Sequence, residues 1–328
     1  MRAFEDIPNE ILLQIASDVH SSDQLSLSLT SQRLHSIAES HLYRSVTLAD
    51  LVRGEKSERK LQRFLRTIIS RPELGAITRH LNILWYEDYD GGLAFGPKKY
   101  EDRGYLATMQ TLAREKGLSA LAVSELENGW CPPHFSLLMH LLPSLESLLL
   151  RGMDMETRWI RAQSEYYGPT PGLRSLSVLQ MSSLRAEDVI LFMAQPTLNS
   201  FRAGFFWGRG KIRWDEDNNG PSGDPGGGFP EGKQGIFRTI RFVKRSSKLK
   251  NLEFHSSAVD SELFDVILQI PEALETLIYG DDRSHDHIDL PAMARALRYQ
   301  INSLTTLSPL ATWLTTSNPW VPSVTLHC

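Results

Sequence analysis

The stretch LKNLEFHSSAVDSELFDVILQIPEALETLIY, residues 249–279, contains the pattern that decides the fold of most of the chain. It starts and ends with one phrase, apolar-x-x-apolar-x-apolar, formed by Leu249, Leu252 and Phe254 and again by Leu274, Leu277 and Tyr279. Between the phrases, residues 261–270 place apolar side chains at helical spacing, and Pro271 closes the helix. A strand, a helix and a second strand with short links predict parallel strands joined by right-handed crossovers.

The same phrase returns along the chain, as LESLLL (145–150), LRSLSV (173–178), LNSFRA (198–203) and LTTLSP (304–309). The phrases at 173 and 198, and those at 249 and 274, begin 25 residues apart. Amphipathic segments lie between the phrases, and two earlier strands, 44–48 and 80–86, are expected to begin the stack. Self-similarity at such a period is typical of repeat architectures, and L-x-x-L-x-L is the strand signature of leucine-rich repeats.

For residues 49–328 we therefore predict an irregular, leucine-rich-repeat-like α/β solenoid with parallel strands and helices on the outer face. The repeats lack the Asn or Cys of regular leucine-rich repeats, so an ordinary α/β fold whose strands share a hydrophobic rhythm is the alternative. The last residues, 309–328, lose the period and form either an atypical cap or the product of a misread gene end.

Two insertions interrupt this pattern, at 87–104 and at 208–235, and the second holds nine of the 22 glycines of the chain. Insertions in a solenoid map to one face, which is often the face that binds. Aromatic residues at strand ends beside such loops are typical anchors of protein interfaces. We therefore expect a target protein to contact Trp85, Tyr86, Phe206 and Trp207, whose alternative role is packing at the rim of the solenoid.

The first fifty residues have a different, purely helical character. Ile7, Ile11, Ile15 and Val19 recur every four residues, which predicts an amphipathic helix with Pro8 in its first turn. Two further short helices are expected over 21–44, separated near residue 31. A three-helix unit this small buries little, so it packs on the rest of the chain or leaves an apolar face for a partner.

Residues 5–48 resemble the F-box motif in the form common in fungal proteins. The resemblance is carried by Ile7-Pro8-Asn9-Glu10-Ile11-Leu12, by Asp23-Gln24-Leu25 with Leu27 and Leu29, and by Arg33 and Leu42-Tyr43-Arg44. It implies that residues 1–48 form a helical module whose apolar face inserts into the Skp-type adaptor of an SCF ubiquitin ligase, and through it reaches the cullin and RING subunits. The binding face implied by the motif comprises Pro8, Ile11, Leu12, Ile15, Leu25, Leu29, Arg33 and Leu34.

Charge and cysteine content exclude several other classes. The formal net charge of −4 gives no reason to expect nucleic-acid or anionic-membrane binding, and no apolar run is long enough to span a membrane. The two cysteines, Cys131 and Cys328, lie far apart, which favours a reducing cytoplasmic or nuclear compartment over a disulfide framework.

Enzyme motifs are not found in the sequence. GRGK (208–211) lacks the spacing of a phosphate-binding loop, and Cys131 with His134 fits a structural loop better than a nucleophilic pair. The His/Asp run 281–289 is read as a solvated loop rather than a metal site, so we predict no metal and no cofactor. The predicted function is a non-catalytic substrate adaptor of a ubiquitin ligase, and the alternatives are an F-box scaffold outside a ligase or an enzyme whose site assembles only in three dimensions.

Overall fold

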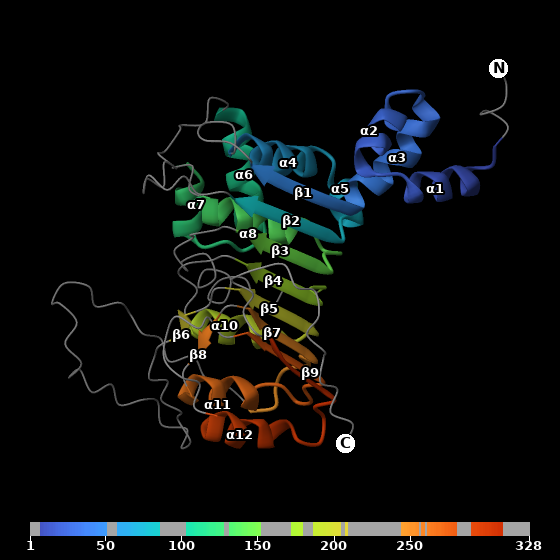
Figure 1. Cartoon of the computed structure of the whole chain (residues 1–328). Helices are drawn as coiled ribbons and strands as arrows, with labels where there is room; N and C mark the ends of the chain where they lie inside the picture. The colour runs from blue at the N-terminus through green and yellow to red at the C-terminus, as the bar shows by residue number, and fades with distance from the viewer. Residues whose placement is uncertain are drawn as a thin grey trace. The chain divides into compact units, whose positions relative to one another are not determined.

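The computed structural model describes residues 7–50, 58–85, 103–127, 131–151, 172–179, 186–204, 207–208, 244–255, 257–259, 261–280 and 290–310. The chain divides into two compact units, Met1–Gln180 and Met181–Cys328. Each unit combines helices with a set of parallel strands (Figure 1). The predicted α/β class with parallel strands is therefore confirmed.

Unit 1 begins with the three predicted helices, α1 (Asn9–Asp18), α2 (Ser21–Ser28) and α3 (Gln32–Arg44). Ser31 caps α3, because its side-chain oxygen accepts a hydrogen bond from the Leu34 N–H at 3.2 Å. The small core of this helical module consists of Leu12, Ala16 and Ile37, against which Ile7, Leu27 and Leu34 pack.

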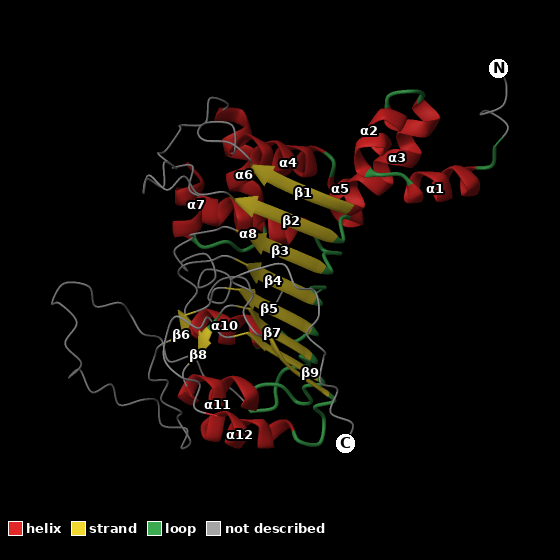
Figure 2. Cartoon of the chain, viewed as in Figure 1, coloured by secondary structure: helices red, strands yellow, loops and turns green. Residues whose placement is uncertain are grey.

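Four parallel strands follow in unit 1, in the order β1 (Ser45–Asp50), β2 (His80–Trp85), β3 (Ser147–Arg151) and β4 (Ser175–Leu179). Two helices connect β1 to β2, α4 (Glu58–Ser70) and α5 (Pro72–Ile77). Three more connect β2 to β3, namely α6 (Arg103–Glu115), α7 (Ala120–Glu127) and α8 (Cys131–Leu141). In β3 every second side chain is buried, and the helices α4 and α8 lie behind these strands in Figure 2, so one face of the sheet is covered by helices.

Unit 2 repeats this arrangement with four parallel strands, β5 (Ser200–Gly204), β7 (Asn251–His255), β9 (Thr276–Gly280) and β10 (Thr306–Leu310). A separate pair of short strands, β6 (Trp207–Gly208) and β8 (Ala258–Val259), is also parallel. The helical elements are α10 (Ala186–Met193), α11 (Ser261–Gln269), α12 (Leu290–Leu297) and the 3-10 helix η2 (Arg298–Gln300).

The six apolar phrases coincide with β3, β4, β5, β7, β9 and β10, and they pair at equivalent positions. Leu148 lies opposite Leu176 in unit 1, and Leu252 lies opposite Leu277 in unit 2. These side chains are at most 4% exposed, whereas Leu307 of the last phrase is half-buried. The repetition thus produces in-register parallel strands over a common apolar layer, while the classification as leucine-rich repeats stays a prediction.

One end of each predicted insertion lies in regular secondary structure. Helix α6 begins at Arg103 and β6 includes Gly208, so residues 103–104 are helical and residue 208 is in a strand. Residues 87–102 and 209–235 lie outside the described residues, as does the 311–328 part of the atypical C-terminal segment.

Helix α5 packs against the end of α8 through a glycine. A Cβ atom at Gly75 would lie 2.9 Å from Cγ2 of Ile68 and nearer still to the carbonyl oxygen of Leu141. The backbone of Leu141 and the buried side chain of Ile68 cannot move aside without a cost in free energy. The close approach of the two helices therefore requires a residue without a side chain at position 75.

We predict that Gly75→Ala destabilises the protein by about 1–3 kcal/mol, because the added methyl group overpacks this contact. The sign of the change in the free energy of unfolding tests the argument, because replacing glycine by alanine at an uncrowded helical position would stabilise the protein by up to about 1 kcal/mol. Urea unfolding measures the change. The exposed neighbour Ala76→Ser serves as control and should shift the free energy of unfolding by less than about 0.5 kcal/mol. A Gly75→Ala protein as stable as the parent contradicts the packing argument.

Candidate protein-interaction site

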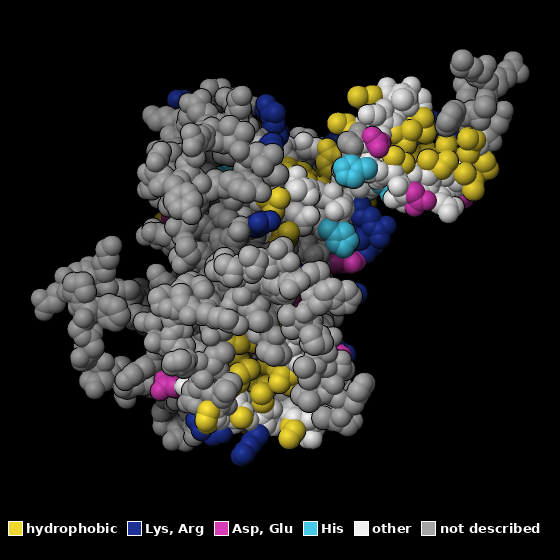
Figure 3. All heavy atoms as spheres, in the orientation of Figure 1, with side chains coloured by type: hydrophobic (Ala, Val, Ile, Leu, Met, Phe, Trp, Pro, Cys, Tyr) yellow, Lys and Arg dark blue, Asp and Glu magenta, His cyan; other side chains and the backbone are white. Residues whose placement is uncertain are grey.

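The helical module exposes an unusual amount of apolar surface. Among the described residues, eight large hydrophobic side chains are exposed, and five of them lie on α1, on α2 and just after it: Ile11 (47%), Leu13 (40%), Ile15 (43%), Leu25 (56%) and Leu29 (80%). Figure 3 shows hydrophobic side chains gathered over this module. Contiguous apolar surface rimmed by polar residues marks an interaction site.

The exposure follows from the apolar stripe of α1 being wider than the module can cover. Leu12 and Ala16 are four residues apart and face the core, where they are 2% and 0% exposed. Ile11 and Ile15 form a second i, i+4 row beside them and remain in solvent. A helix of this kind offers its outer row to the groove of a partner.

The eight residues implied by the motif divide into two groups. Ile11, Ile15, Leu25 and Leu29 are exposed apolar side chains, and the exposed Pro8 precedes the first helical residue. The other three serve the module itself: Leu12 is buried in its core, Leu34 packs against that core, and Arg33 joins two helices. The structure thus brings the four exposed apolar residues onto one small module.

Arg33 holds the beginning of α1 against α3. Its Nε and Nη2 donate hydrogen bonds to Oδ1 of Asn9 at 2.9 and 2.7 Å, and Nη2 also donates to the carbonyl oxygen of Ile7 at 2.5 Å. These bonds fix the entry to the helix that carries the exposed isoleucines. The arginine therefore orients the apolar surface.

Sequence reasoning missed two contributors to this surface. Leu13 is exposed on the other side of the buried Leu12 from Ile11 and adds to the exposed apolar area of α1. Gln24 is buried, and its amide donates hydrogen bonds to the carbonyl oxygens of Ala16 at 2.7 Å and Val19 at 3.1 Å. Because those carbonyls are at the C-terminal end of α1, the glutamine caps that end and ties α2 to it. No sequence signal distinguishes such a glutamine from a solvated one.

The aromatic residues predicted to contact a target are only partly described. Trp85 ends β2 and Trp207 begins β6, but their side chains, and Tyr86 and Phe206 entirely, lie outside the described residues. The strand predicted over 80–86 ends at Trp85, whereas β6 was not predicted, and the role of these aromatic residues in binding stays a prediction.

A polar cluster lies on the strands of unit 2. Glu253 of β7 accepts hydrogen bonds through Oε2 from Nε of Arg202 at 2.6 Å, while Nε2 of His255 lies 3.0 Å from the same oxygen. The hydrogen bond from His255, supported by Arg202, lowers the pKa of Glu253 to about 2 despite the opposing effect of burial. A carboxylate held ionised this firmly is a poor proton donor near neutral pH, so the cluster is suited to cross-strand stabilisation.

Two further features, a metal-binding group and a membrane-spanning helix, are not found in the part of the chain that the structure describes. Within that part, no group of three or more His, Cys, Asp and Glu residues is placed to hold a metal ion. No described helix has the length and apolar character needed to cross a membrane. The His/Asp run 281–289 and the side chain of Cys131 fall outside the described residues, and His134 is buried in α8.

Comparison with known families identifies the helical module. Residues 4–49 match the F-box-like family. The F-box-like domain thus covers α1, α2 and α3 together with most of β1. Domains of this family generally bind Skp-type adaptors, which suggests a role as a ubiquitin-ligase adaptor or in another protein interaction. No curated protein matches the chain.

The lowered pKa of Glu253 predicts a pH-dependent contribution to stability. Because the folded-state pKa of about 2 is below the ordinary value of 4.5, the contribution is complete above pH 4.5 and is lost as the pH falls toward 2. We expect Glu253→Gln to lower the free energy of unfolding by about 2 kcal/mol at pH 7 and by progressively less below pH 4.5.

Urea unfolding at several pH values measures this difference. The matched control is Glu272→Gln, which removes an exposed carboxylate of the same unit and should change stability by less than about 0.5 kcal/mol. A loss for Glu253→Gln that stays constant down to pH 3 contradicts the ionic origin of the effect.

Proposed function

We propose that this protein is a substrate-recognition adaptor of an SCF-type ubiquitin ligase. In this proposal the helical module, residues 1–48, docks on a Skp-type adaptor, and residues 49–328 bind the target protein as a degenerate leucine-rich-repeat-like domain. The cullin and RING subunits are reached through the Skp-type adaptor. The observation that carries the proposal is the exposed apolar row of α1 and α2 within an F-box-like domain.

The exposed apolar row supports docking on energetic grounds. Full burial of one leucine or isoleucine side chain contributes about 1.5–3 kcal/mol. Five such side chains, each already partly buried, contribute on the order of 5–10 kcal/mol, which is the scale needed to offset the loss of rotational and translational freedom on association. The exposed leucines after and within α2 are expected to be the strongest anchors because they have the most surface left to bury.

An adaptor of this kind performs no chemistry itself. It raises the effective concentration of target lysines near the conjugating enzyme, so it requires two binding surfaces and no catalytic groups or cofactor. The proposal includes a module of the form common in fungal proteins and action in the cytoplasm or nucleus. The latter is supported by the two widely separated cysteines.

We predict that Leu25→Asp and Leu29→Asp each weaken binding to a purified Skp-type adaptor at least about tenfold. Each change places a carboxylate where an apolar side chain would be buried, at a cost of several kcal/mol. Calorimetric titration measures the affinity, and circular dichroism checks that the helices persist. Both leucines are exposed, so the folded protein tolerates the changes.

The matched control is Leu121→Asp, which alters a leucine that is 61% exposed on α7, outside the module. Its affinity should equal that of the parent. Equal affinities for all three variants contradict docking through α1 and α2.

A scaffold that binds the adaptor outside a ligase is distinguished by target turnover. We expect cells that express Leu29→Asp in place of the parent to show longer half-lives for a subset of proteins, measured by pulse-chase proteomics. Unchanged half-lives together with normal adaptor binding by the parent favour the scaffold.

A further inference from the structure

The helical module is joined to the sheet of unit 1 without a linker. Arg44 is the last residue of α3 and Ser45 is the first residue of β1. The carbonyl oxygen of Arg44 accepts a hydrogen bond from the Arg79 N–H at 2.9 Å, at the entrance of the neighbouring strand. The ring of Tyr43 stacks on Phe64 of α4, with 6.4 Å between centroids and 15° between planes. The last turn of α3 is therefore attached to the body of the unit.

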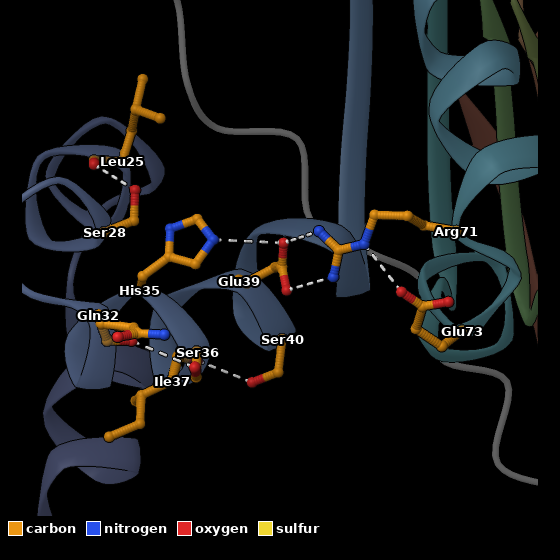
Figure 4. Close-up of polar contacts among 10 residues, drawn as sticks. All are labelled: Leu25, Ser28, Gln32, His35, Ser36, Ile37, Glu39, Ser40, Arg71 and Glu73. Atoms are coloured by element: carbon orange, nitrogen blue, oxygen red, sulfur yellow. Dashed lines mark hydrogen bonds and ion pairs between the residues drawn. The ribbon is translucent and has the colours of Figure 1, made fainter.

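One attached turn acts as a pivot and leaves the direction of the helix axis to be set elsewhere. Glu39 lies five residues before Arg44, which corresponds to about 7.5 Å along the helix. At that level a second attachment is present. Arg71, between α4 and α5, donates hydrogen bonds from Nη1 and Nη2 to the two carboxylate oxygens of Glu39 at 2.5 and 2.8 Å (Figure 4).

Arg71 itself is held by its surroundings. Its N–H donates to the carbonyl oxygen of Thr67 at 2.8 Å, and Pro72 follows as the first residue of α5. The third donor of the guanidinium, Nε, binds Oε1 of Glu73 at 2.8 Å. The fork therefore projects from a defined corner between two helices and meets a carboxylate in the planar, bidentate geometry that arginine favours.

The ionic character of the pair is maintained at neutral pH. Hydrogen bonding to Arg71 lowers the pKa of Glu39 against the opposing effect of burial, and the side chain of Glu39 is only 18% exposed. His35, one turn earlier on α3, places its Nε2 3.6 Å from Oε1 of Glu39, and Glu73 is the other charged group at the site. The carboxylate is thus shared between groups on α3 and a guanidinium fixed at the α4–α5 corner.

We propose that Arg71 is a positioning residue that sets the direction of the helical module relative to the sheet of unit 1. The pivot at Ser45 and the fork at Glu39 together define the axis of α3, as two points define a line. The exposed apolar residues of α1 and α2 are consequently presented at one angle to the sheet. This role is independent of the proposed function, because it concerns the chain alone.

Pulsed electron–electron double resonance, which measures the distance distribution between two spin labels, tests the proposal on the full chain. Labels are attached to Gln14→Cys on α1 and Arg63→Cys on α4, both at exposed positions, after Cys131 and Cys328 are replaced by serine. The parent should give one narrow distance distribution. Arg71→Met should make it at least about twice as wide, because α3 then pivots about its last turn.

Three companion variants isolate the cause. Glu39→Gln keeps the size of the side chain and should broaden the distribution as Arg71→Met does. Arg71→Lys keeps the charge but loses the fork, and should give an intermediate width. Glu73→Gln removes the charge at the corner but keeps an oxygen that accepts the hydrogen bond from Nε of Arg71, and should leave the distribution narrow.

Salt provides a test that requires no substitution at the pair. Arg71 is 45% exposed, so 1 M NaCl should screen the pair and widen the parent distribution, with no effect on Arg71→Met. Widths for Arg71→Met and Glu39→Gln that equal the parent width overturn the proposal, and show that the Tyr43–Phe64 stack and the backbone junction alone fix the module. Leu29→Asp alters only the proposed docking surface and should keep the narrow parent distribution, so failure of adaptor binding and failure of this inference are read from different measurements.

Discussion

The backbone hydrogen bond at the entrance of each parallel strand is the interaction on which the rest of the structure depends. In unit 2 the N–H of Lys250 donates to the carbonyl oxygen of Asn199 at 2.9 Å. The N–H of Glu275 donates to the carbonyl oxygen of Lys250 at 2.8 Å, and the N–H of Thr305 donates to the carbonyl oxygen of Glu275 at 2.9 Å. Each bond places a strand in the same register as the one before it. A slip of one residue would turn the buried leucines to solvent, so the register and the apolar layer enforce one another.

The helical module obeys a different balance. It has too few residues to enclose its apolar side chains, and its core amounts to Leu12, Ala16 and Ile37 with their neighbours. Polar contacts from Arg33 and Gln24 hold the three helices in place. The apolar row of α1 is therefore left for a partner, which links the small size of the module to its use as a docking surface.

The fold was predictable wherever one short pattern repeats. The phrases placed β3, β4, β5, β7, β9 and β10, because a buried strand in a parallel sheet requires the same spacing each time. Helix α5 between β1 and β2 was missed, as were α6 and α7 between β2 and β3, since short helices without repeated spacing give no periodic signal. The same holds for the small strands β6 and β8.

The site was predictable as far as a local motif extends. The four-residue spacing predicted the apolar face of α1. It did not predict which apolar side chains turn into the core, because Leu12 and Ile11 are adjacent in sequence and differ by one step around the helix. The pairing of Arg71 with Glu39 spans 32 residues of sequence and has no local signature. Contacts of this kind become visible only when the strands have brought their connections together.

The direct passage from α3 into β1 has a consequence for the evolution of such chains. Because β1 belongs to the stretch matched by the F-box-like family and also forms the outermost strand beside β2, the two parts share a structural element. A recombination event that exchanged residues 4–49 would also remove a strand and uncover the polar backbone edge of β2, which invites aggregation. The boundary at which this domain can be exchanged as an independent unit therefore does not coincide with the end of its helices.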